Sequence, residues 1–294
     1  MSTRKGIILA GGSGTRLFPV TEVISKQLLP VYDKPMIYYP LTTLMLAKIR
    51  EILIISTKKD INNFKLLLGD GSQWGISLKY AIQTAPNGIA ESLIISEKFV
   101  GKSDIALVLG DNIFFGSSFS EKLGSECEKN DRASIFLYRV NDPENYGVVK
   151  IDKNKKPIDI IEKPKIFISN YAVTGLYFYS NEAIDIAKTL KPSKRGELEI
   201  TDVNKEYLNQ KKLDCNILER GFAWLDTGTH NNLLEASEFV STIQKRQGLM
   251  IACPEEIALR MNWISVETIE YRISSLENSS YGLYLKKIIN ELKN

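Results

Sequence analysis

The sequence predicts an α/β fold. We expect a doubly wound, mostly parallel, Rossmann-like sheet, then a partly antiparallel lobe and a helical C-terminal appendage. Apolar strand-like runs alternate with helical patterns up to residue 111, which indicates parallel strands with helices on both faces. Between residues 133 and 180 strand-like runs follow one another with little helix between them, which favours antiparallel pairing. The tail from Leu249 onward has an amphipathic helical pattern.

The elements of the first half alternate strictly between strand and helix. Pro40 lies near the first turn of a predicted helix, where proline is tolerated, and Gly69 ends another. Ligands of such a sheet bind beyond the carboxyl ends of its strands. We predict strands at 6–11, 51–57, 78–84 and 105–111, and helices at 36–49, 61–69 and 89–100.

The second half begins with strands and returns to helices. The segment 222–248 is predicted to be a strand end, a turn and a long helix, with Thr229 as its N-cap. There is no linker or internal repeat, so we expect a single domain over 1–294, with lobes at 1–132 and 133–248 and a helical region at 249–294. The other predicted elements are strands at 133–140, 146–152, 157–163 and 171–180, and helices at 181–190 and 202–210.

The composition excludes several function classes. The formal charge is +3, from 38 basic and 35 acidic residues, which disfavours a nucleic-acid binder. The three cysteines and the single histidine, His230, disfavour disulfides, a zinc site and a histidine-dependent triad. The N-terminal apolar run is too short for a signal peptide, and no stretch reaches the length of a membrane span. We therefore expect a cytoplasmic protein that does not contact membranes.

A glycine-rich loop follows the first predicted strand, in "ILAGGSGTRLFP" (8–19). It lacks the spacing and the lysine of a P-loop, and the last glycine of a dinucleotide-binding fingerprint. Consecutive glycines nevertheless let backbone N–H groups converge on an anion. Arg16 adds a forked donor suited to phosphate oxygens. The loop therefore predicts a phosphate site that is neither of the two common ones.

The stretch after the loop carries a family resemblance. "LAGGSGTRLFPVTEVISKQLLPVYDKPMIYYPL" resembles the signature of sugar-1-phosphate nucleotidylyltransferases and looks most like the glucose-1-phosphate thymidylyltransferase branch. The resemblance covers essentially the whole chain. Further matching segments are "LVLGDNIFFG", "YGVVKID", "EKPK", "SNYAVTGLYFY", "RGELEITDVN", "AWLDTGTHNNLLEAS" and "QGLMIACPEEIA".

The resemblance implies a reaction and its partners. Glucose 1-phosphate attacks the α-phosphorus of dTTP in line, and dTDP-glucose and pyrophosphate are released, as the first step of a dTDP-rhamnose-type pathway. It further implies Mg²⁺ as cofactor, a homotetramer built from dimers, a nucleotide-binding lobe at 1–132 and a sugar-phosphate-binding lobe at 133–248. Such a transfer needs two anions held together, a metal and positive charge on the developing oxyanions.

The resemblance also assigns roles to the nucleotide side. Arg16 and the backbone amides of 11–15 would hold the β- and γ-phosphates, with Lys26 as a second cation. Asp111 and Asp226, each at a strand end, would meet at the top of the sheet and bind Mg²⁺ through oxygen ligands. The base would be read by Gln83, whose amide both donates and accepts, and by the backbone at Gly88. The expected nucleotide site comprises Leu9, Gly11, Gly12, Gly14, Thr15, Arg16, Lys26, Gln83, Gly88 and Asp111.

On the sugar side, the resemblance implies that Lys163 and Arg195 hold the incoming phosphate. Glu162 and the backbone of Gly147 and Val173 would read the sugar hydroxyls. Tyr146 and Tyr177 would lie nearby, although aromatic residues on strands are more often core residues. The expected catalytic residues are Arg16, Lys26, Asp111, Lys163 and Asp226.

Two positions depart from the family pattern. Position 91 is Glu91, where the family pattern predicts glutamine. We favour the interpretation that Glu91 lies on a solvated helix face and has no effect on the reaction. If it lies near the nucleotide or the sugar instead, it would alter specificity. Ser120 stands where relatives often carry histidine, beside an implied second nucleotide site for feedback inhibition. Glu256 and Arg260 have the spacing of a surface ion pair as an alternative role. The candidate feedback residues are Gly116, Ser120, Arg220, Glu256, Ile257 and Arg260.

Several alternatives remain open. The chain could be a sister enzyme that prefers UTP or another hexose 1-phosphate. Thymine differs from uracil by one methyl group, and contact with a methyl group changes binding by only about 1–3 kcal/mol. A catalytically inactive sugar-nucleotide sensor would be expected to lack one of the charged residues named above, all of which are present. A metal-dependent glycosyltransferase would usually show a D-x-D motif where this chain has Gly110-Asp111-Asn112-Ile113.

Overall fold

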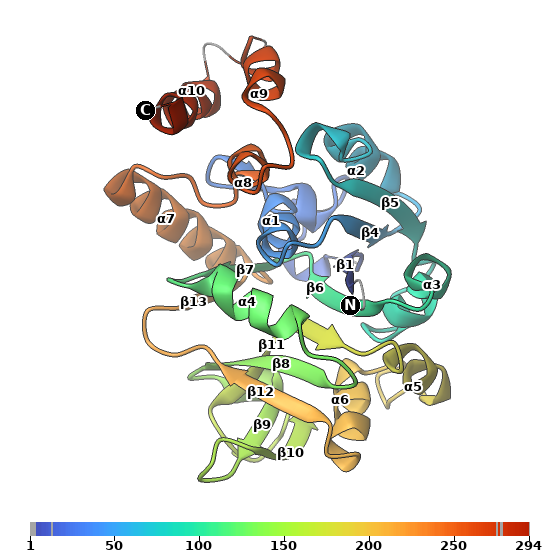
Figure 1. Cartoon of the computed structure of the whole chain (residues 1–294). Coiled ribbons are helices and arrows are strands. Elements are labelled where there is room, and N and C mark those ends of the chain that lie inside the picture. Colours follow the sequence, from blue (N-terminus) through green and yellow to red (C-terminus); the bar gives the residue numbers. More distant parts are fainter. Residues whose placement is uncertain (1–3, 13, 275, 277–278, 294) are drawn as a thin grey trace.

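One nine-stranded mixed sheet forms the centre of the molecule (Figure 1). The computed structural model describes residues 4–12, 14–274, 276 and 279–293. Four parallel strands lie side by side in the order β6–β1–β4–β5, which confirms the predicted doubly wound half. Their bounds are β1 Arg4–Ala10, β4 Glu51–Ser56, β5 Ser77–Ile82 and β6 Asp104–Leu109.

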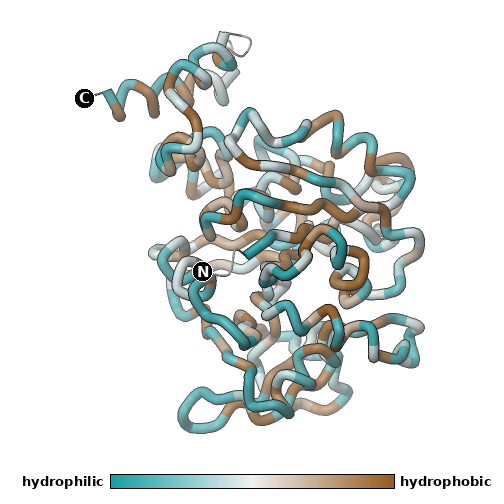
Figure 2. The backbone as a smooth tube through the Cα atoms, turned by 45° about the vertical axis from the view of Figure 1, so that its right-hand side comes forward, coloured by the Kyte–Doolittle hydropathy of each residue, from teal (hydrophilic) through white to brown (hydrophobic). Residues whose placement is uncertain are grey.

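Both faces of β1, β4 and β6 are apolar because helices cover both, whereas β5 lies at the edge of the sheet and has exposed residues. Along β1, Ile8 and Ala10 face one hydrophobic cluster, and Ile7 and Leu9 face the other. The tube in Figure 2 is accordingly brown along much of the central strands. The first face packs on α1 (Tyr38–Leu46), α2 (Ile61–Leu68), α4 (Phe119–Cys127) and α8 (Pro254–Arg260). The second face packs on α3 (Glu91–Val100), α5 (Ala183–Thr189) and α6 (Ile200–Asn209).

The second half of the chain extends the same sheet. β11 (Tyr171–Tyr179) runs antiparallel to β6 with Tyr177 opposite Leu107, and it also pairs with β8 (Ala133–Arg139) and β9 (Gly147–Ile151). β10 (Pro157–Glu162) completes that edge beside β9. The predicted partly antiparallel region is therefore continuous with the parallel strands, and the two halves are joined through β6 and β11.

The sequence patterns missed several short elements. β12 (Leu213–Ile217) pairs parallel with β8. Its sequence, LDCNI, alternates apolar and polar residues as a strand does, but the prediction includes no strand there. β7 (Asn112–Phe115) was also missed. It forms a separate two-stranded ribbon with β13 (Ala223–Asp226), which is the strand end predicted at the start of 222–248. The remaining short elements are β2 (Pro30–Val31), β3 (Lys34–Pro35), η1 (Thr15–Leu17), η2 (Lys26–Leu28), η3 (Ser72–Trp74) and η4 (Pro143–Asn145).

The C-terminal region is helical, as predicted. α7 (His230–Gln247) begins at Thr229, whose Oγ1 accepts a hydrogen bond from the Asn232 backbone N–H at 3.2 Å, so the predicted N-cap is confirmed. α9 (Val266–Ile273) and α10 (Ser280–Lys293) pack on each other, and α10 also packs on α8 (Figure 1). No helix in the described part of the chain is long and apolar enough to cross a membrane.

A buried arginine, Arg4, connects the strands at the end of the sheet where β1 begins. Arg4 Nη1 donates to the carbonyls of Ile105 and Tyr179 at 2.8 and 2.9 Å, and Nη2 donates to that of Lys129 at 2.8 Å. Its side chain is only 4% exposed. One guanidinium therefore satisfies carbonyl groups on β6, on β11 and in the turn after α4.

We predict that Arg4→Met lowers the free energy of unfolding by roughly 3 kcal/mol, because buried carbonyl groups lose a charged donor. Urea denaturation measures the change. The matched control is Lys79→Met on an exposed position of β5, which should shift stability by less than about 0.5 kcal/mol. Equal effects of the two substitutions would contradict the role given to Arg4.

Candidate active site

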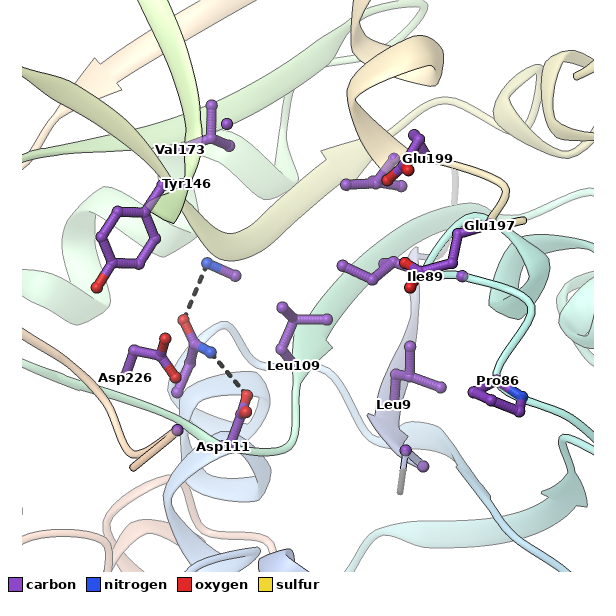
Figure 3. A pocket seen from close by; sticks show the side chains of 18 of the residues that line it. Leu9, Pro86, Ile89, Leu109, Asp111, Tyr146, Val173, Glu197, Glu199 and Asp226 are labelled. Carbon is purple, nitrogen blue, oxygen red and sulfur yellow. Dashed lines mark hydrogen bonds between the residues drawn. The ribbon is translucent and has the colours of Figure 1, made fainter. Parts of the chain in front are cut away.

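A pocket of about 420 Å³ lies beyond the carboxyl ends of the parallel strands. It is within the size range of small-molecule sites. In Figure 3, Asp111, Asp226 and Tyr146 lie on one side of this pocket and Leu9, Pro86 and Ile89 on the other. Every residue predicted from the sequence for the nucleotide, sugar-phosphate and metal sites lines it: Leu9, Gly11, Gly12, Gly14, Thr15, Arg16, Lys26, Gln83, Gly88, Asp111, Tyr146, Gly147, Glu162, Lys163, Val173, Tyr177, Arg195 and Asp226.

The glycine loop leaves β1 in a conformation that favours glycine. Gly12 and Gly14 have φ values of 107° and 60°, in the left-handed half of backbone space. Ser13, one of the residues whose amides were expected to bind phosphate, lies outside the described residues. Arg16 reaches across to the turn after β13, where a Cβ added to Gly228 would lie 2.9 Å from its Nη2. The guanidinium can approach this closely because position 228 has no side chain.

Asp111 lies just beyond β6 and is held by charge and hydrogen bonds. Lys26, in η2, forms an ion pair with its Oδ2, and Asn112 Nδ2 donates to its Oδ1 at 2.9 Å. Burial opposes ionisation of Asp111, but Lys26 and these hydrogen bonds outweigh it and lower its pKa. Asp111 is therefore an anion at neutral pH.

Asp226 lies near Asp111, but on a different sheet from the predicted one. It ends β13, which pairs with β7 and not with the main sheet, and it lies opposite Asn112 in that ribbon. The expectation of two strand ends on one sheet is thus wrong, although the two carboxyl groups do come together (Figure 3). Burial and the negative charge of Asp111 raise the pKa of Asp226 to about 6.

These two carboxyl groups suit a hard divalent cation. Within the described residues, no group of three or more His, Cys, Asp or Glu side chains is placed to hold a metal. Mg²⁺, however, commonly binds through one or two carboxylates and completes its shell with water and substrate phosphates. Burial raises the pKa of Asp226 most, and the repulsion by Asp111 that adds to it is what a cation bound by these carboxylates would relieve. The donor set therefore fits Mg²⁺ shared with a phosphate.

Gln83 lies at the opposite end of the pocket and is only 6% exposed. Its Nε2 donates to the Gly88 carbonyl at 3.2 Å and to Glu91 Oε2 at 2.7 Å. Gly88 has a φ of 106°, and a Cβ there would lie 2.4 Å from the Leu198 carbonyl oxygen. The favoured interpretation of Glu91 as a solvated residue is wrong, because the turn between β5 and α3 brings its carboxylate onto Gln83.

The sugar side of the pocket is dominated by carboxylates around one arginine. Arg195 Nη2 lies 2.7 Å from Glu199 Oε2, 3.4 Å from Glu162 Oε1 and 3.7 Å from Glu197 Oε2. Thr201 Oγ1 donates to Glu162 Oε2 at 2.5 Å. The donors of Arg195 thus face carboxylates of the protein itself. A bound phosphate would compete with them for the same N–H groups.

The remaining predicted residues on this side differ in exposure. Tyr177 is 3% exposed and stacks on Tyr179, so its ring belongs mainly to the core. Tyr146 packs edge-on against Trp224 with ring centroids 5.2 Å apart. Lys163 follows β10 with a φ of 44°, which is strained for a residue with a side chain and frequent at functional sites.

The candidate feedback residues lie outside this pocket. A Cβ added to Gly116 would lie 2.3 Å from the Phe222 ring, and Ser120 is an exposed residue of α4. Arg220 is exposed in the loop between β12 and β13. Ile257, on α8, is partly buried and packs against the first hydrophobic cluster. On α8, Arg260 Nε donates to Glu256 Oε1 at 2.8 Å, the surface pair given as the alternative.

Sequence reasoning overlooked residues that support the predicted ones. Asn112 directly follows Asp111 in "GDN", and this position next to a predicted site residue could have indicated that it belongs to the site. Glu199 and Thr201 lie in "RGELEIT", beside Arg195, but only the fold shows that they contact the pocket. The other lining residues not predicted are Gln27, Pro86, Ile89, Leu109, Asn145, Gly175, Glu197, Ile200, Trp224 and Gly228.

Comparison with known proteins gives a consistent result. The sequence model described as "Nucleotidyl transferase" matches residues 5–243. A glucose-1-phosphate thymidylyltransferase of Neisseria meningitidis is 54% identical over 287 residues, which is 98% of this chain and 100% of that protein.

Solved structures agree in fold. A Bacillus anthracis protein of the same designation, crystallised with sucrose, superimposes with a TM-score of 0.74 at 43% identity, over 80% of this chain and 94% of that one. A UDP-glucose pyrophosphorylase bound to UDP-glucose has a TM-score of 0.71 at 24% identity, over 84% of this chain and 100% of that one. The second similarity concerns the fold alone.

Proposed function

This chain belongs to the nucleotidyl transferase family, and from that premise we propose how its pocket residues divide the reaction among themselves. The activity is that of a glucose-1-phosphate thymidylyltransferase, as the sequence predicted. Glucose 1-phosphate and dTTP react to give dTDP-glucose and pyrophosphate. The observation that carries the proposal is the meeting of Asp111 and Asp226 with Lys26 and Arg16 beside the glycine loop.

The glycine loop and the two cations would hold the leaving group. Arg16 supplies several N–H donors to the β- and γ-phosphates, and the backbone of Gly11 and Gly12 approaches them without a Cβ. Lys26 is paired with Asp111. When a triphosphate enters, the ammonium group lies between two anions and can bridge them. Pyrophosphate thus departs toward fixed positive charge, which stabilises the charge that develops on it.

Asp111 and Asp226 would hold Mg²⁺ through their carboxylate oxygens. The ion would neutralise charge on the phosphate oxygens at the α-phosphorus. Asn112 keeps Asp111 oriented through its 2.9 Å hydrogen bond.

Lys163 and Arg195 would hold the phosphate of the incoming glucose 1-phosphate. The charges of these two side chains reduce the repulsion between the attacking phosphate oxygen and the triphosphate. The side chains also hold that oxygen in line with the bond that breaks. Glu162 would accept hydrogen bonds from sugar hydroxyls, and the backbone of Gly147 and Val173 would complete the sugar site. Gln83 and the backbone at Gly88 would read the base at the opposite end.

Further expectations extend the same proposal. The residues near Gly116 and on α8 form the candidate site for feedback by an end-product sugar nucleotide. We also propose a homotetramer built from dimers, which light scattering tests, and a place at the start of dTDP-rhamnose-type deoxysugar synthesis.

Purified protein with Mg²⁺ should release pyrophosphate from dTTP and glucose 1-phosphate. The assay crosses dTTP, UTP, ATP and GTP with several hexose 1-phosphates and measures kcat/KM for each pair. The pair of dTTP and glucose 1-phosphate should give the highest value. Release of no pyrophosphate from any pair would refute the proposed activity, and a preference for UTP would assign the chain to the sister reaction.

Asp226→Asn should lower kcat by at least about a thousandfold, because an amide leaves the metal one anionic ligand short. The fold should persist, since the substituted group is nearly the same size, and circular dichroism checks this. Asp185→Asn, on the exposed side of α5, is the matched control and should leave kcat unchanged. Near-normal turnover by the Asp226 variant would remove this residue from the metal site.

Mg²⁺ affinity should depend on pH through Asp226. A carboxyl group whose pKa is raised to about 6 is protonated below that pH, so protons compete with the metal there. The apparent Kd for Mg²⁺, measured by calorimetry, should be constant above pH 7 and rise by up to about tenfold per pH unit below 6. A Kd that stays constant from pH 8 to pH 5 would contradict this assignment.

A further inference from the structure

Position 228 is occupied by glycine for a reason other than backbone conformation. Gly12 and Gly14 have positive φ values, which favour glycine, whereas the φ of Gly228 lies outside the left-handed region and does not require it. A Cβ at position 228 would lie 2.9 Å from Arg16 Nη2 and 3.2 Å from both Cζ and Nη1. The guanidinium of Arg16 therefore occupies the space that a side chain at position 228 would need.

The connection that carries Gly228 is fixed on both sides. It runs over 227–229, between β13 and α7. Thr227 is fully buried and donates to the Asp111 carbonyl from its backbone N–H at 3.2 Å and from Oγ1 at 2.9 Å. On the other side, Thr229 caps α7 by accepting the Asn232 backbone N–H at 3.2 Å. Gly228 thus offers a fixed surface against which a flexible side chain can rest.

Arg16 reaches this surface without using a hydrogen-bond donor. Within the part of the chain that the structure describes, its guanidinium makes no hydrogen bond and no ion pair. Lys26 and Arg195 differ, because each of them is paired with a carboxylate of the protein. The five N–H groups of Arg16 therefore remain available to a molecule in the pocket, which Arg16 and Gly228 both line.

We propose that Gly228 is a positioning residue, whose missing side chain lets the Arg16 guanidinium rest on the connection 227–229 with its donors free for the β- and γ-phosphates. The inference rests on the proposed function, in which Arg16 holds the leaving group. An arginine side chain has many rotamers, so a contact that restricts them before binding reduces the entropy lost on binding. A hydrogen-bonded partner would restrict them too, but it would occupy N–H groups that the phosphates need.

The contact between Arg16 and Gly228 joins parts of the site from opposite ends of the chain. Arg16 lies in η1, directly after the glycine loop, and Gly228 lies two residues after Asp226. The cation for the leaving group is thereby held at a fixed place relative to a carboxylate proposed to bind Mg²⁺. A side chain at position 228 would disturb this arrangement without altering either charged group.

Gly228→Ala adds one methyl group and should displace the Arg16 guanidinium. Calorimetry with Mg²⁺ present should give Kd values for dTTP and for inorganic pyrophosphate about tenfold higher than in the native protein. The Kd for dTMP, which has no β- or γ-phosphate, should change by less than about twofold. Gly124→Ala, on α4, adds the same methyl group where no atom lies within 4 Å and should leave all three values unaltered.

A double-mutant cycle determines whether the added methyl group acts through Arg16. Arg16→Met removes the guanidinium and should itself weaken dTTP binding. In that background Gly228→Ala should change the Kd for dTTP by less than about twofold, because no guanidinium is left to displace. A methyl group that distorted the connection or moved Asp226 would instead weaken dTTP binding equally in both backgrounds.

The same double variant covers the case in which Gly228→Ala does not fold. Without the guanidinium the methyl group has room, so Arg16→Met/Gly228→Ala should fold, and urea denaturation measures this. A double variant that does not fold would show that position 228 needs glycine for its backbone or for another neighbour, and would overturn the inference.

Failure of the proposed function and failure of this inference give different results. Absence of pyrophosphate release by the native protein would refute the proposed function, whereas the Kd values test the contact between Arg16 and Gly228 without turnover. The inference would be overturned by an unchanged Kd for dTTP in Gly228→Ala, or by equal weakening of dTTP and dTMP. Equal effects of Gly228→Ala with and without Arg16 would overturn it too, as would a native protein that binds neither dTTP nor pyrophosphate.

Discussion

The pocket depends on the hydrogen bonds of one buried amide, Asn112. Its Oδ1 accepts from the Gly175 backbone N–H at 3.0 Å and from Trp224 Nε1 at 2.6 Å, and its Nδ2 donates to Asp111. The side chain thus joins β7, β11 and β13 at the point where the main sheet meets the ribbon. A Cβ added to Gly175 would lie 2.7 Å from the Asn112 side chain, so the contact requires glycine on β11. Through these bonds the two halves of the molecule hold one carboxylate in a fixed position.

The protein's own groups balance the charge in the pocket only partly. Asp111 is paired with Lys26, whereas Asp226 has its pKa raised by burial and by Asp111. On the sugar side, Arg195 is surrounded by carboxylates instead. A divalent cation bound with the triphosphate would compensate the excess negative charge at Asp111 and Asp226. On the sugar side, an incoming phosphate would compete with these carboxylates for the N–H groups of Arg195.

The fold and most of the site could be predicted from the sequence. Apolar runs on β1, β4 and β6 indicated a parallel sheet, because strands buried on both faces contain few polar residues. The glycine loop indicated a phosphate site, since consecutive glycines expose backbone N–H groups. The residues that the family resemblance assigned to the nucleotide, sugar-phosphate and metal sites all line one pocket, although other lining residues such as Asn112 and Glu199 were missed. Glu162 and Asp226 could not have been brought together by local patterns, because strands far apart in the chain carry them.

The sequence by itself determined the order of the main strands and helices along the chain, the loop that approaches phosphate, and the types of charged group available to the site. These follow from side-chain periodicity and backbone freedom, which are local properties. The tertiary structure alone decided that Asp226 arrives on a ribbon with β7, that β12 joins β8, and that Glu91 contacts Gln83 instead of solvent. Such contacts depend on how distant segments pack. The direction of a side chain relative to another element is set by that packing and not by the spacing of residues along the chain.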